Sequence, residues 1–333
     1  MVELILNKPR NLTLRSMEIQ PPLNYDDVKV RLIYGGICGS DLGVFQGKIK
    51  YASYPIRPGH ELLGTVVDAG ENVKSMIGVR VVVFPNSFCG ECEQCKKGKT
   101  NICIQKKSLG VNTDGGFSQE FIISSKYVIP VPDGMPDQKA VLVEPFSVIV
   151  HAFNRVVITE ETSVAVIGCG SEGMLAVAFA NYLGAQVTAI DINSVKLDLV
   201  KKLGSVRTML PQELTNEVFD VVIEASGSGS AMEQGIKLVK SGGSMVLVGL
   251  VPEAVLPIVY IVRQEISLLG SIIYDVNDFL HAIEFLKDDL FDVHPIVSRI
   301  MPISAYQQAY DLALSGDVGK ILLDFREVVQ TIN

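Results

Sequence analysis

The sequence contains no tryptophan, no block of lysine or arginine longer than a pair, and no apolar stretch approaching about 18 residues. Its formal net charge is −8 and its pI is near 5.1, so it offers no electrostatic surface for nucleic acid or for an anionic membrane. The N-terminal segment "MVELILNKPRNL" lacks the basic start and the cleavage site of a signal peptide. We therefore expect a cytoplasmic protein whose partner is a small molecule.

Two domains are expected, because 333 residues are about twice the length of a typical domain. From residue 1 to about 140, short β-type segments are broken by Gly and Pro. From about 163, strands, glycine turns and helices alternate, which predicts right-handed βαβ units in a parallel sheet. Short β-type segments return after about residue 281. The predicted fold class is α/β, with a doubly wound parallel sheet at 146–281 and a mostly β domain formed by 1–145 and 282–333.

Four of the six cysteines fall within the segment "CGECEQCKKGKTNIC", in the pattern C-x2-C-x2-C-x7-C. Four thiolates at such spacing can surround a tetrahedral Zn²⁺ and leave no position for water, which is typical of a structural site. An Fe–S cluster would use the same sulfur atoms. Disulfides are disfavoured in the reducing compartment that we expect. The sequence thus predicts a metal-binding lobe at residues 89–103, with Cys89, Cys92, Cys95 and Cys103 as ligands.

A dinucleotide-binding fingerprint follows the first strand of the second domain. In "VAVIGCGSEGML", Gly168 makes the tight turn, Gly170 lets the backbone approach a pyrophosphate, and Gly173 allows the helix to pack closely on the strand. Asp191 ends the next strand, where its carboxylate can accept hydrogen bonds from the adenosine ribose, and this favours NAD over NADP. Glu172 is unusual, because it suits the helix dipole yet would repel a pyrophosphate unless it points outward.

Three further segments carry candidate metal ligands: "GGICGSDLG" with Cys38, "GHELLGTVVDAG" with His60 and Glu61, and "LVEPFSVIVHA" with Glu144. Taken alone, Cys38 could be a buried core thiol and Glu144 a helix-capping carboxylate. The order and rough spacing of these segments, together with the cysteine lobe and "VIGCGxxG", resemble the zinc-dependent medium-chain dehydrogenase/reductase family over essentially the whole chain. Glu144 is similar to the glutamate of its polyol and sugar-acid branch.

The resemblance implies a Rossmann NAD-binding domain at 146–281, a GroES-like catalytic domain around it, and two Zn²⁺ per chain. It implies that Cys38 and His60 bind the catalytic zinc, that Glu61 and Glu144 compete for the third protein position, and that Asp41 orients the His60 ring. Ser40 corresponds to the family residue that passes the proton of the bound alcohol outward. The implied reaction transfers hydride from a secondary alcohol to NAD, and relatives are usually homodimers or homotetramers.

The sequence departs from the family pattern in two places, one that concerns the proton path and one that concerns the substrate. Gly43 stands where many relatives have a histidine, so a direct histidine relay is missing. Ile272 and Ile273 stand where several polyol enzymes have an arginine, which indicates a substrate less polar than a hexitol. The alternatives are an aliphatic alcohol dehydrogenase and, more remotely, a non-catalytic homologue. A zincless quinone reductase would lack the Cys38, His60 and Glu144 set.

Overall fold

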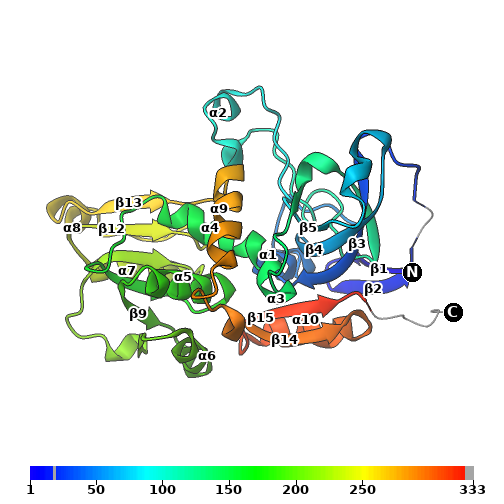
Figure 1. Ribbon diagram of the computed structural model, residues 1–333. Helices are drawn as coiled ribbons and strands as arrows, with labels where there is room; N and C mark the ends of the chain where they lie inside the picture. The colour runs from blue at the N-terminus through cyan, green and yellow to red at the C-terminus, as the bar shows by residue number, and fades with distance from the viewer. Residues whose placement is uncertain (18–19, 327–333) are drawn as a thin grey trace. The chain divides into compact units, whose positions relative to one another are not determined.

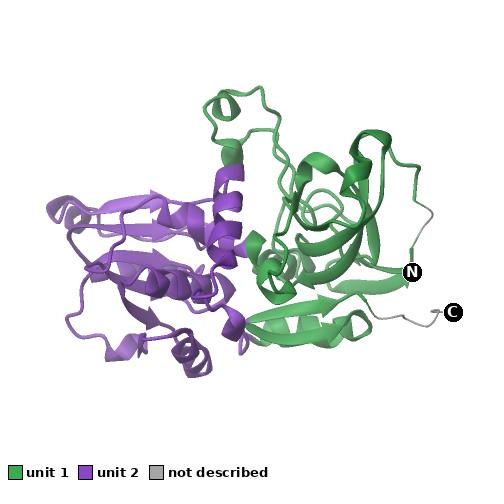
Figure 2. Cartoon of the chain, viewed as in Figure 1, with its two compact units in different colours: residues 1–144, 297–315, 320–333 green, residues 145–296, 316–319 purple. Residues whose placement is uncertain are grey.

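The computed structural model describes residues 1–17 and 20–326, and the chain divides into two compact units (Figure 2). Unit 1 comprises Met1–Glu144, Val297–Ser315 and the segment from Lys320 to the last described residue, and unit 2 comprises Pro145–Ile296 and Gly316–Gly319. The first junction lies within one residue of the expected boundary. The second lies at 296/297 rather than 281/282, because helix α9 (Val276–Lys287) begins in unit 2 and continues past residue 282. Residues 327–333, which we assigned to the first domain, lie outside the described residues.

Unit 1 is mostly antiparallel β structure (Figure 1). Its main sheet has the order β14-β15-β3-β4-β5-β7, with β6 also paired to β3, and only the β14–β15 pairing is parallel. The strands are β1 (Val2–Lys8), β2 (Asn11–Ser16), β3 (Asp27–Gly36), β4 (Glu61–Ala69), β5 (Arg80–Val83), β6 (Glu120–Ser124), β7 (Val128–Pro130), β14 (Val297–Pro302) and β15 (Lys320–Asp324). Its helices are α1 (Gly39–Phe45), α2 (Glu93–Lys96), α3 (Asp137–Ala140) and α10 (Tyr306–Ser315).

Strand β3 lies between β15 and β4 and carries an alternating pattern. Val28, Val30, Leu32 and Tyr34 are buried, in keeping with the period of two that a strand gives to its side chains. The carboxyl end of β3 leads directly into the loop that carries Cys38, and the amino end of β4 follows His60. The pairing of β3 with β4 therefore brings two distant segments of candidate ligands to one end of the sheet.

Unit 2 is a six-stranded parallel sheet with the order β10-β9-β8-β11-β12-β13. Its strands are β8 (Ser163–Ile167), β9 (Gln186–Ile190), β10 (Arg207–Met209), β11 (Phe219–Glu224), β12 (Val239–Leu247) and β13 (Ser267–Gly270). The helices are α4 (Val143–Phe153), which opens at the junction, α5 (Ser171–Tyr182), α6 (Ser194–Val200), α7 (Gly229–Gly235), α8 (Ile258–Arg263) and α9. The order reverses between β8 and β11, as in doubly wound folds, and the predicted α/β class is confirmed.

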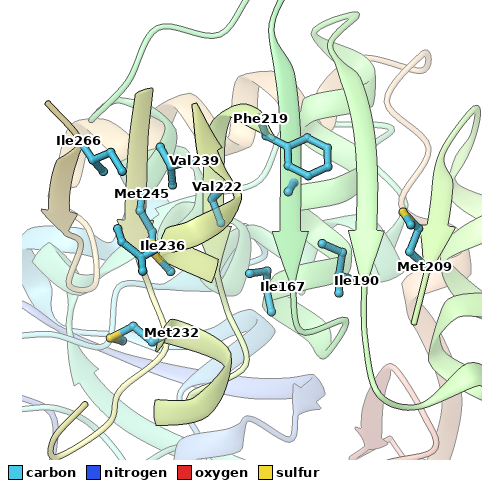
Figure 3. Close-up of a cluster of buried hydrophobic side chains, with 11 residues drawn as sticks. Ile167, Ile190, Met209, Phe219, Val222, Met232, Ile236, Val239, Met245 and Ile266 are labelled. Carbon is cyan, nitrogen blue, oxygen red and sulfur yellow. The ribbon is translucent and has the colours of Figure 1, made fainter. Parts of the chain in front are cut away.

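Burial on both faces of this sheet explains its apolar strands. One face packs Ile167, Val222 and Met245 of the central strands against Met232 and Ile236 of the α7 segment (Figure 3). On α5, residues 173–180 are all buried, so that helix is apolar around its circumference rather than along one stripe. Its Phe179 meets Phe146 of α4 edge to face, with ring centroids 5.1 Å apart. These contacts fix the helix whose first turn follows the glycine fingerprint.

None of the helices within residues 1–17 and 20–326 has the length and the apolar character needed to cross a lipid bilayer.

Candidate metal and cofactor sites

Asp41 joins the two loops that carry the candidate ligands of the first site. Cys38 precedes α1 as its N-cap, and the Cys38 amide donates to Asp41 Oδ2 at 3.0 Å. The amide of Gly59 donates to the other oxygen, Oδ1, at 3.2 Å. Asp41 is only 1% exposed, so these bonds are shielded from water. One buried carboxylate thereby holds the Cys38 loop against the loop that ends in His60.

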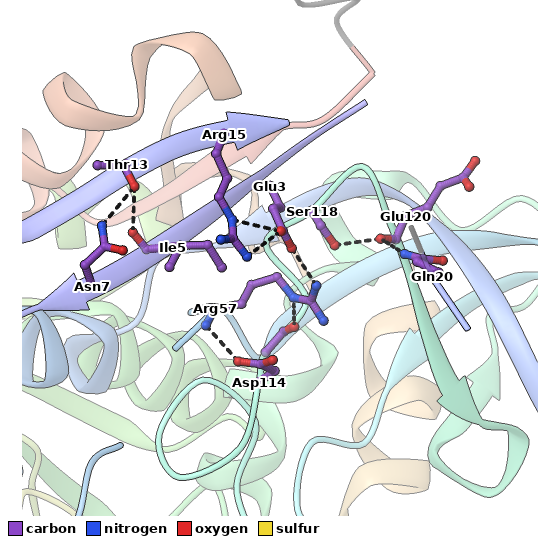
Figure 4. A network of polar contacts seen from close by, with 11 residues as sticks. Glu3, Ile5, Asn7, Thr13, Arg15, Gln20, Arg57, Asp114, Ser118 and Glu120 are labelled. Atoms are coloured by element: carbon purple, nitrogen blue, oxygen red, sulfur yellow. Dashed lines mark hydrogen bonds and ion pairs between the residues drawn. The ribbon is translucent and has the colours of Figure 1, made fainter. Parts of the chain in front are cut away.

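The loop before His60 is also held in place by contacts of Arg57 (Figure 4). Arg57 donates from Nη1 to buried Glu3 at 2.9 Å and from Nε to the Gly115 carbonyl at 2.6 Å. Its backbone amide donates to Asp114 at 3.0 Å. The following residues, Pro58 and Gly59, accept from the backbone of 116–117. The position of the His60 ring is therefore set by the fold rather than by the loop alone.

The His60 ring lies between Asp41 and Ser40. Its Nδ1 is 3.6 Å from Asp41 Oδ1, and its Nε2 is 3.3 Å from Ser40 Oγ. Burial by itself would lower the pKa of His60, but the nearby negative charge of Asp41, with a smaller effect of Cys38, raises that pKa well above its ordinary value. The Asp41 carboxylate thus favours the positively charged form of the His60 ring when no metal is bound.

Cys38, His60 and Glu61 form the ligand group at this corner. One donor atom from each of the three lies within 4.8 Å of the donors of the others. A thiolate, an imidazole and a carboxylate with room for one more ligand are the donor set of an open zinc site, so these residues fit that ion. Glu144 is buried in the first turn of α4 and is not a member of this group. Of the two competing carboxylates, the structure brings Glu61 to the cysteine and the histidine.

Lys320, which the sequence analysis did not single out, contacts Glu61. Its Nζ donates to Glu61 Oε1 at 2.5 Å, and both side chains are 0% exposed. Lys320 opens β15 near the end of the chain, 259 positions from Glu61. A single lysine before an apolar strand gives no signal of such a role, because the contact depends on the order of strands in the sheet.

The four cysteines of the lobe lie together at residues 89–103. The Sγ of Cys89 is 3.5 Å from that of Cys103 and 3.9 Å from that of Cys95. A tetrahedral site with Zn–S bonds of about 2.3 Å separates its sulfurs by about 3.8 Å, so the spacing fits a single metal ion. All six cysteines are free of disulfides.

Backbone amides around the lobe stabilise thiolates. The amides of Cys95 and Ile104 donate to Cys92 and lower its pKa to about 6, whereas burial raises the pKa of Cys95 to about 12. Such opposed values are expected when several thiols are crowded without a cation, since their negative charges repel one another. A bound Zn²⁺ would offset this repulsion between thiolates, and this supports the prediction of a closed four-thiolate site.

The glycine fingerprint forms the turn between β8 and α5. Gly168 has φ of +90°, and a Cβ there would lie 2.5 Å from the Cα of Ser226. A Cβ at Gly173 would lie 1.8 Å from the Gly168 carbonyl oxygen, so the helix can start this close to the strand only with glycine. Gly170 is the N-cap of α5 and has open space on its Cβ side. Ser171 then begins the helix whose free amides can receive a phosphate.

Asp191 follows β9 and is 8% exposed. Its Oδ2 accepts from the Cys169 amide at 2.6 Å, and its Oδ1 accepts from the Asn193 amide at 2.8 Å. The carboxylate is thus tied to the glycine turn, and each oxygen keeps a further lone pair for a ligand. The Cys169 thiol is buried, and burial, followed by the charge of Asp191, raises its pKa to about 12.

A second carboxylate, Glu224, supports the same turn and was not predicted. Glu224 ends β11, is 0% exposed, and accepts through Oε1 from the amides of Ser226 and Gly227 at 2.8 and 3.2 Å. Ser226 is the residue that packs against Gly168. Glu224 therefore helps to hold the glycine turn from the neighbouring strand.

Comparison with known proteins agrees with this arrangement. Residues 24–133 match the alcohol dehydrogenase GroES-like domain, and residues 173–288 match the zinc-binding dehydrogenase domain. The chain is 30% identical over 328 residues to a sorbitol dehydrogenase from Bacillus subtilis, covering 93% of this chain and 92% of the relative.

Two solved structures share the fold over nearly the whole length. An alcohol dehydrogenase from Escherichia coli CFT073, in complex with NADH, is 27% identical, with a TM-score of 0.90 and coverage of 97% of this chain and 99% of that one. A zinc-binding dehydrogenase from Sinorhizobium meliloti 1021, bound to NADP, is 26% identical, with a TM-score of 0.90 and coverage of 97% and 98%. Together with the matched domains and the sorbitol dehydrogenase relative, these similarities show that the chain belongs to the zinc-dependent medium-chain dehydrogenase/reductase family.

Proposed function

We propose that the protein is a zinc-dependent, NAD-linked dehydrogenase that oxidises a secondary alcohol of a small polyol, sugar acid or diol, or reduces the corresponding ketone. The observation that carries this proposal is the convergence of Cys38, His60 and Glu61, with Ser40 Oγ 3.3 Å from His60. A family member that had lost catalysis would have no reason to keep an open donor set beside a hydroxyl group.

In this proposal Cys38, His60 and Glu61 would hold the catalytic zinc, which would supply a Lewis acid for the substrate hydroxyl. Asp41 keeps the two ligand loops together and orients His60 through Nδ1. Ser40 Oγ accepts the proton of the substrate hydroxyl and passes it outward. With Gly43 in place of a histidine, Ser40 Oγ would pass that proton on toward water, with Glu144 as the alternative exit. NAD would supply the hydride acceptor when bound, and the protein would bind and orient its nicotinamide.

Glu144, the other candidate ligand, is assigned no direct metal bond in this proposal, because it is not a member of the donor group. His151, seven residues later, is not assigned to the proton path either. Its Nδ1 is 2.7 Å from Asp278 Oδ2, and Asp278 also accepts from Asn154 at 2.8 Å. These contacts join α4 to α9 within unit 2, which is a packing role.

The second zinc is assigned to the lobe, with Cys89, Cys92, Cys95 and Cys103 as its ligands and no position for substrate. Its role is to stabilise a segment that has little regular structure beyond the four-residue helix α2. Removing this metal should unfold the lobe and leave the donor group of Cys38 in place.

NAD is proposed as the cofactor rather than NADP. The two solved relatives were crystallised with NADH and with NADP respectively, so the fold alone does not choose between them. Asp191 supports NAD, because a buried carboxylate fixed by two backbone amides would accept from the ribose hydroxyls and repel a 2′-phosphate. The glycines at 168, 170 and 173 would form the pyrophosphate site.

The proposed substrate class is supported by the similarity to a sorbitol dehydrogenase and by the positions at which this chain departs from the polyol enzymes. Ile272 is 36% exposed and Ile273 follows it, so the segment after β13 offers apolar surface where several polyol enzymes have arginine. This favours a vicinal diol or a short polyol over a hexitol. An aliphatic alcohol dehydrogenase is the second candidate. We further propose a cytoplasmic homodimer or homotetramer, as is usual in the family.

The test is a screen for NAD reduction across diols, polyols, sugar acids and aliphatic alcohols, combined with metal analysis. We expect two zinc ions per chain and activity on a secondary alcohol. Activity confined to primary aliphatic alcohols would favour the second candidate. One zinc per chain, with no activity on any class, would contradict the proposal and indicate a non-catalytic homologue.

A further inference from the structure

A buried ion pair adjoins the proposed catalytic metal site. Lys320 Nζ donates to Glu61 Oε1 at 2.5 Å and to the Ile37 carbonyl oxygen at 3.4 Å, and neither charged side chain is exposed to solvent. Removing an ion from water costs several kcal/mol in a protein interior, so a buried pair persists only where the geometry is favourable. Ile37 is the residue before Cys38, and hence Lys320 lies beside the loop that carries the first candidate ligand.

The sheet holds the pair in place through a glycine. Gly36 of β3 pairs with Glu61 on one side and with Leu322 of β15 on the other. A Cβ at Gly36 would lie 2.0 Å from Glu61 Oε2. The Glu61 side chain therefore occupies the space above Gly36 and reaches toward β15, where Lys320 meets it. The strand order, and not the local sequence, creates this contact.

The charges at this site show what Lys320 contributes. Asp41 and Glu61 are both buried carboxylates, at 1% and 0% exposure; Asp41 accepts from the Cys38 amide, and Glu61 lies beside the Cys38 thiol. Without a metal, Lys320 is the cation that compensates Glu61. With a metal present, Glu61 would have two cations close to it, and these repel each other at short range.

We propose that Lys320 is a positioning residue of the catalytic site that shares Glu61 with the metal. It holds Oε1 and compensates the carboxylate while the site is free of metal. The proposal rests on the proposed function, since it requires a metal at Cys38 and His60. By thermodynamic linkage, removal of Lys320 should destabilise the metal-free protein more than the loaded protein, and metal affinity should rise accordingly.

The test uses Lys320→Met, which keeps the length of the side chain and removes its charge. Co²⁺ is the probe, and the part of its thiolate absorption that is lost in Cys38→Ser reports occupancy of this site, because the four cysteines of the lobe also offer thiolates to Co²⁺. We expect the dissociation constant for Co²⁺ to fall about tenfold or more, because the ion then no longer meets the charge of Lys320, and this is the usual scale of coupling between two sites. The thermal midpoint should fall further without metal than with it. Lys29→Met is the matched control, because Lys29 pairs with Asp68 at 3.9 Å on the same sheet but is partly exposed. The control should change neither quantity.

Two further variants keep the test decisive if Lys320→Met does not fold. Glu61→Gln with Lys320→Met removes both charges and should restore folding. Gly36→Ala leaves Lys320 in place but displaces Glu61, and it should weaken Co²⁺ binding about tenfold or more. If the double variant does not fold and Gly36→Ala binds Co²⁺ as tightly as the parent, the proposal is wrong.

The outcomes separate this inference from the proposed function. Equal destabilisation of the metal-free and loaded forms by Lys320→Met, with Co²⁺ affinity within about twofold of the parent, would show a purely structural ion pair and overturn this inference alone. A parent protein that takes up no Co²⁺ at Cys38 would overturn the proposed function and this inference together.

Discussion

Asp191→Asn gives a sharp test of cofactor choice, because it removes the charge and keeps one oxygen to accept from a backbone amide. The carboxylate is held by the Cys169 and Asn193 amides at 2.6 and 2.8 Å, so it cannot swing away from an incoming 2′-phosphate. Two unit charges about 4 Å apart interact by about 4 kcal/mol at an effective dielectric constant near 20. Solvent around the phosphate weakens this repulsion. We therefore take about 1.4 kcal/mol, a tenfold difference in kcat/KM between NAD and NADP, as the lower bound of its effect.

The assay compares kcat/KM for NAD and for NADP with the same alcohol. The parent should prefer NAD by about tenfold or more, and Asp191→Asn should narrow this ratio, mainly by improving NADP. Asp191→Ala should narrow it as well, but with a lower thermal midpoint, because the buried Cys169 amide and the partly buried Asn193 amide then lose a charged acceptor. A parent that prefers NADP, or an Asp191→Asn variant with an unchanged ratio, would refute the reasoning.

Three other predictions address the metals, the proton path and acid stability. Cys38→Ser should abolish turnover in a folded protein, whereas Cys92→Ser should lower stability and leave Co²⁺ binding at Cys38 intact; a fully active Cys38→Ser enzyme would contradict the assignment. Ser40→Ala should lower kcat about 10²-fold with normal zinc content and NAD affinity, and a variant as fast as the parent would exclude this proton path. Burial alone would raise the pKa of Asp278, but hydrogen bonds, first from His151 and then from the Asp275 amide, lower it overall. Its contribution to stability is therefore complete above the unfolded pKa of about 3.9 and is lost as the pH falls through the lowered folded value. Unfolding by urea between about pH 3 and pH 6 should show a smaller acid-induced loss for Asp278→Asn than for the parent, and equal losses would contradict this sign.

The features that could be predicted from sequence are those whose chemistry is local. The glycines at 168, 170 and 173 and the four cysteines of the lobe each act within one short segment, and spacing alone defines the turn or the ligand shell. The alternation of strands and helices likewise predicted the parallel sheet, and that prediction is confirmed. The short edge strand β10 was not recognised, because three residues carry too little periodicity to be distinguished from a loop.

The features that could not be predicted depend on pairing between distant segments. The second domain junction was expected near 281, since short β-type segments return there. In the structure, α9 spans this position and the second unit continues to Ile296. Sequence similarity left Glu61 and Glu144 as competing ligands. Only the folded chain shows that Glu61 joins Cys38 and His60.

The geometry at the start of β4 explains why two adjacent residues, His60 and Glu61, can both serve one site. Consecutive side chains in a strand point to opposite faces, so a regular strand would separate them. Gly59 has φ of +96°, and a Cβ there would lie 2.0 Å from Phe117, so the chain turns just before the strand in a way that requires glycine. Gly36 then leaves the space that the Glu61 side chain crosses. Two glycines, one in the loop before β4 and one at the end of β3, thus allow an imidazole and a carboxylate from neighbouring positions to join the same donor group. It follows that Gly59→Ala should impair Co²⁺ binding as Gly36→Ala does, even though it changes no ligand.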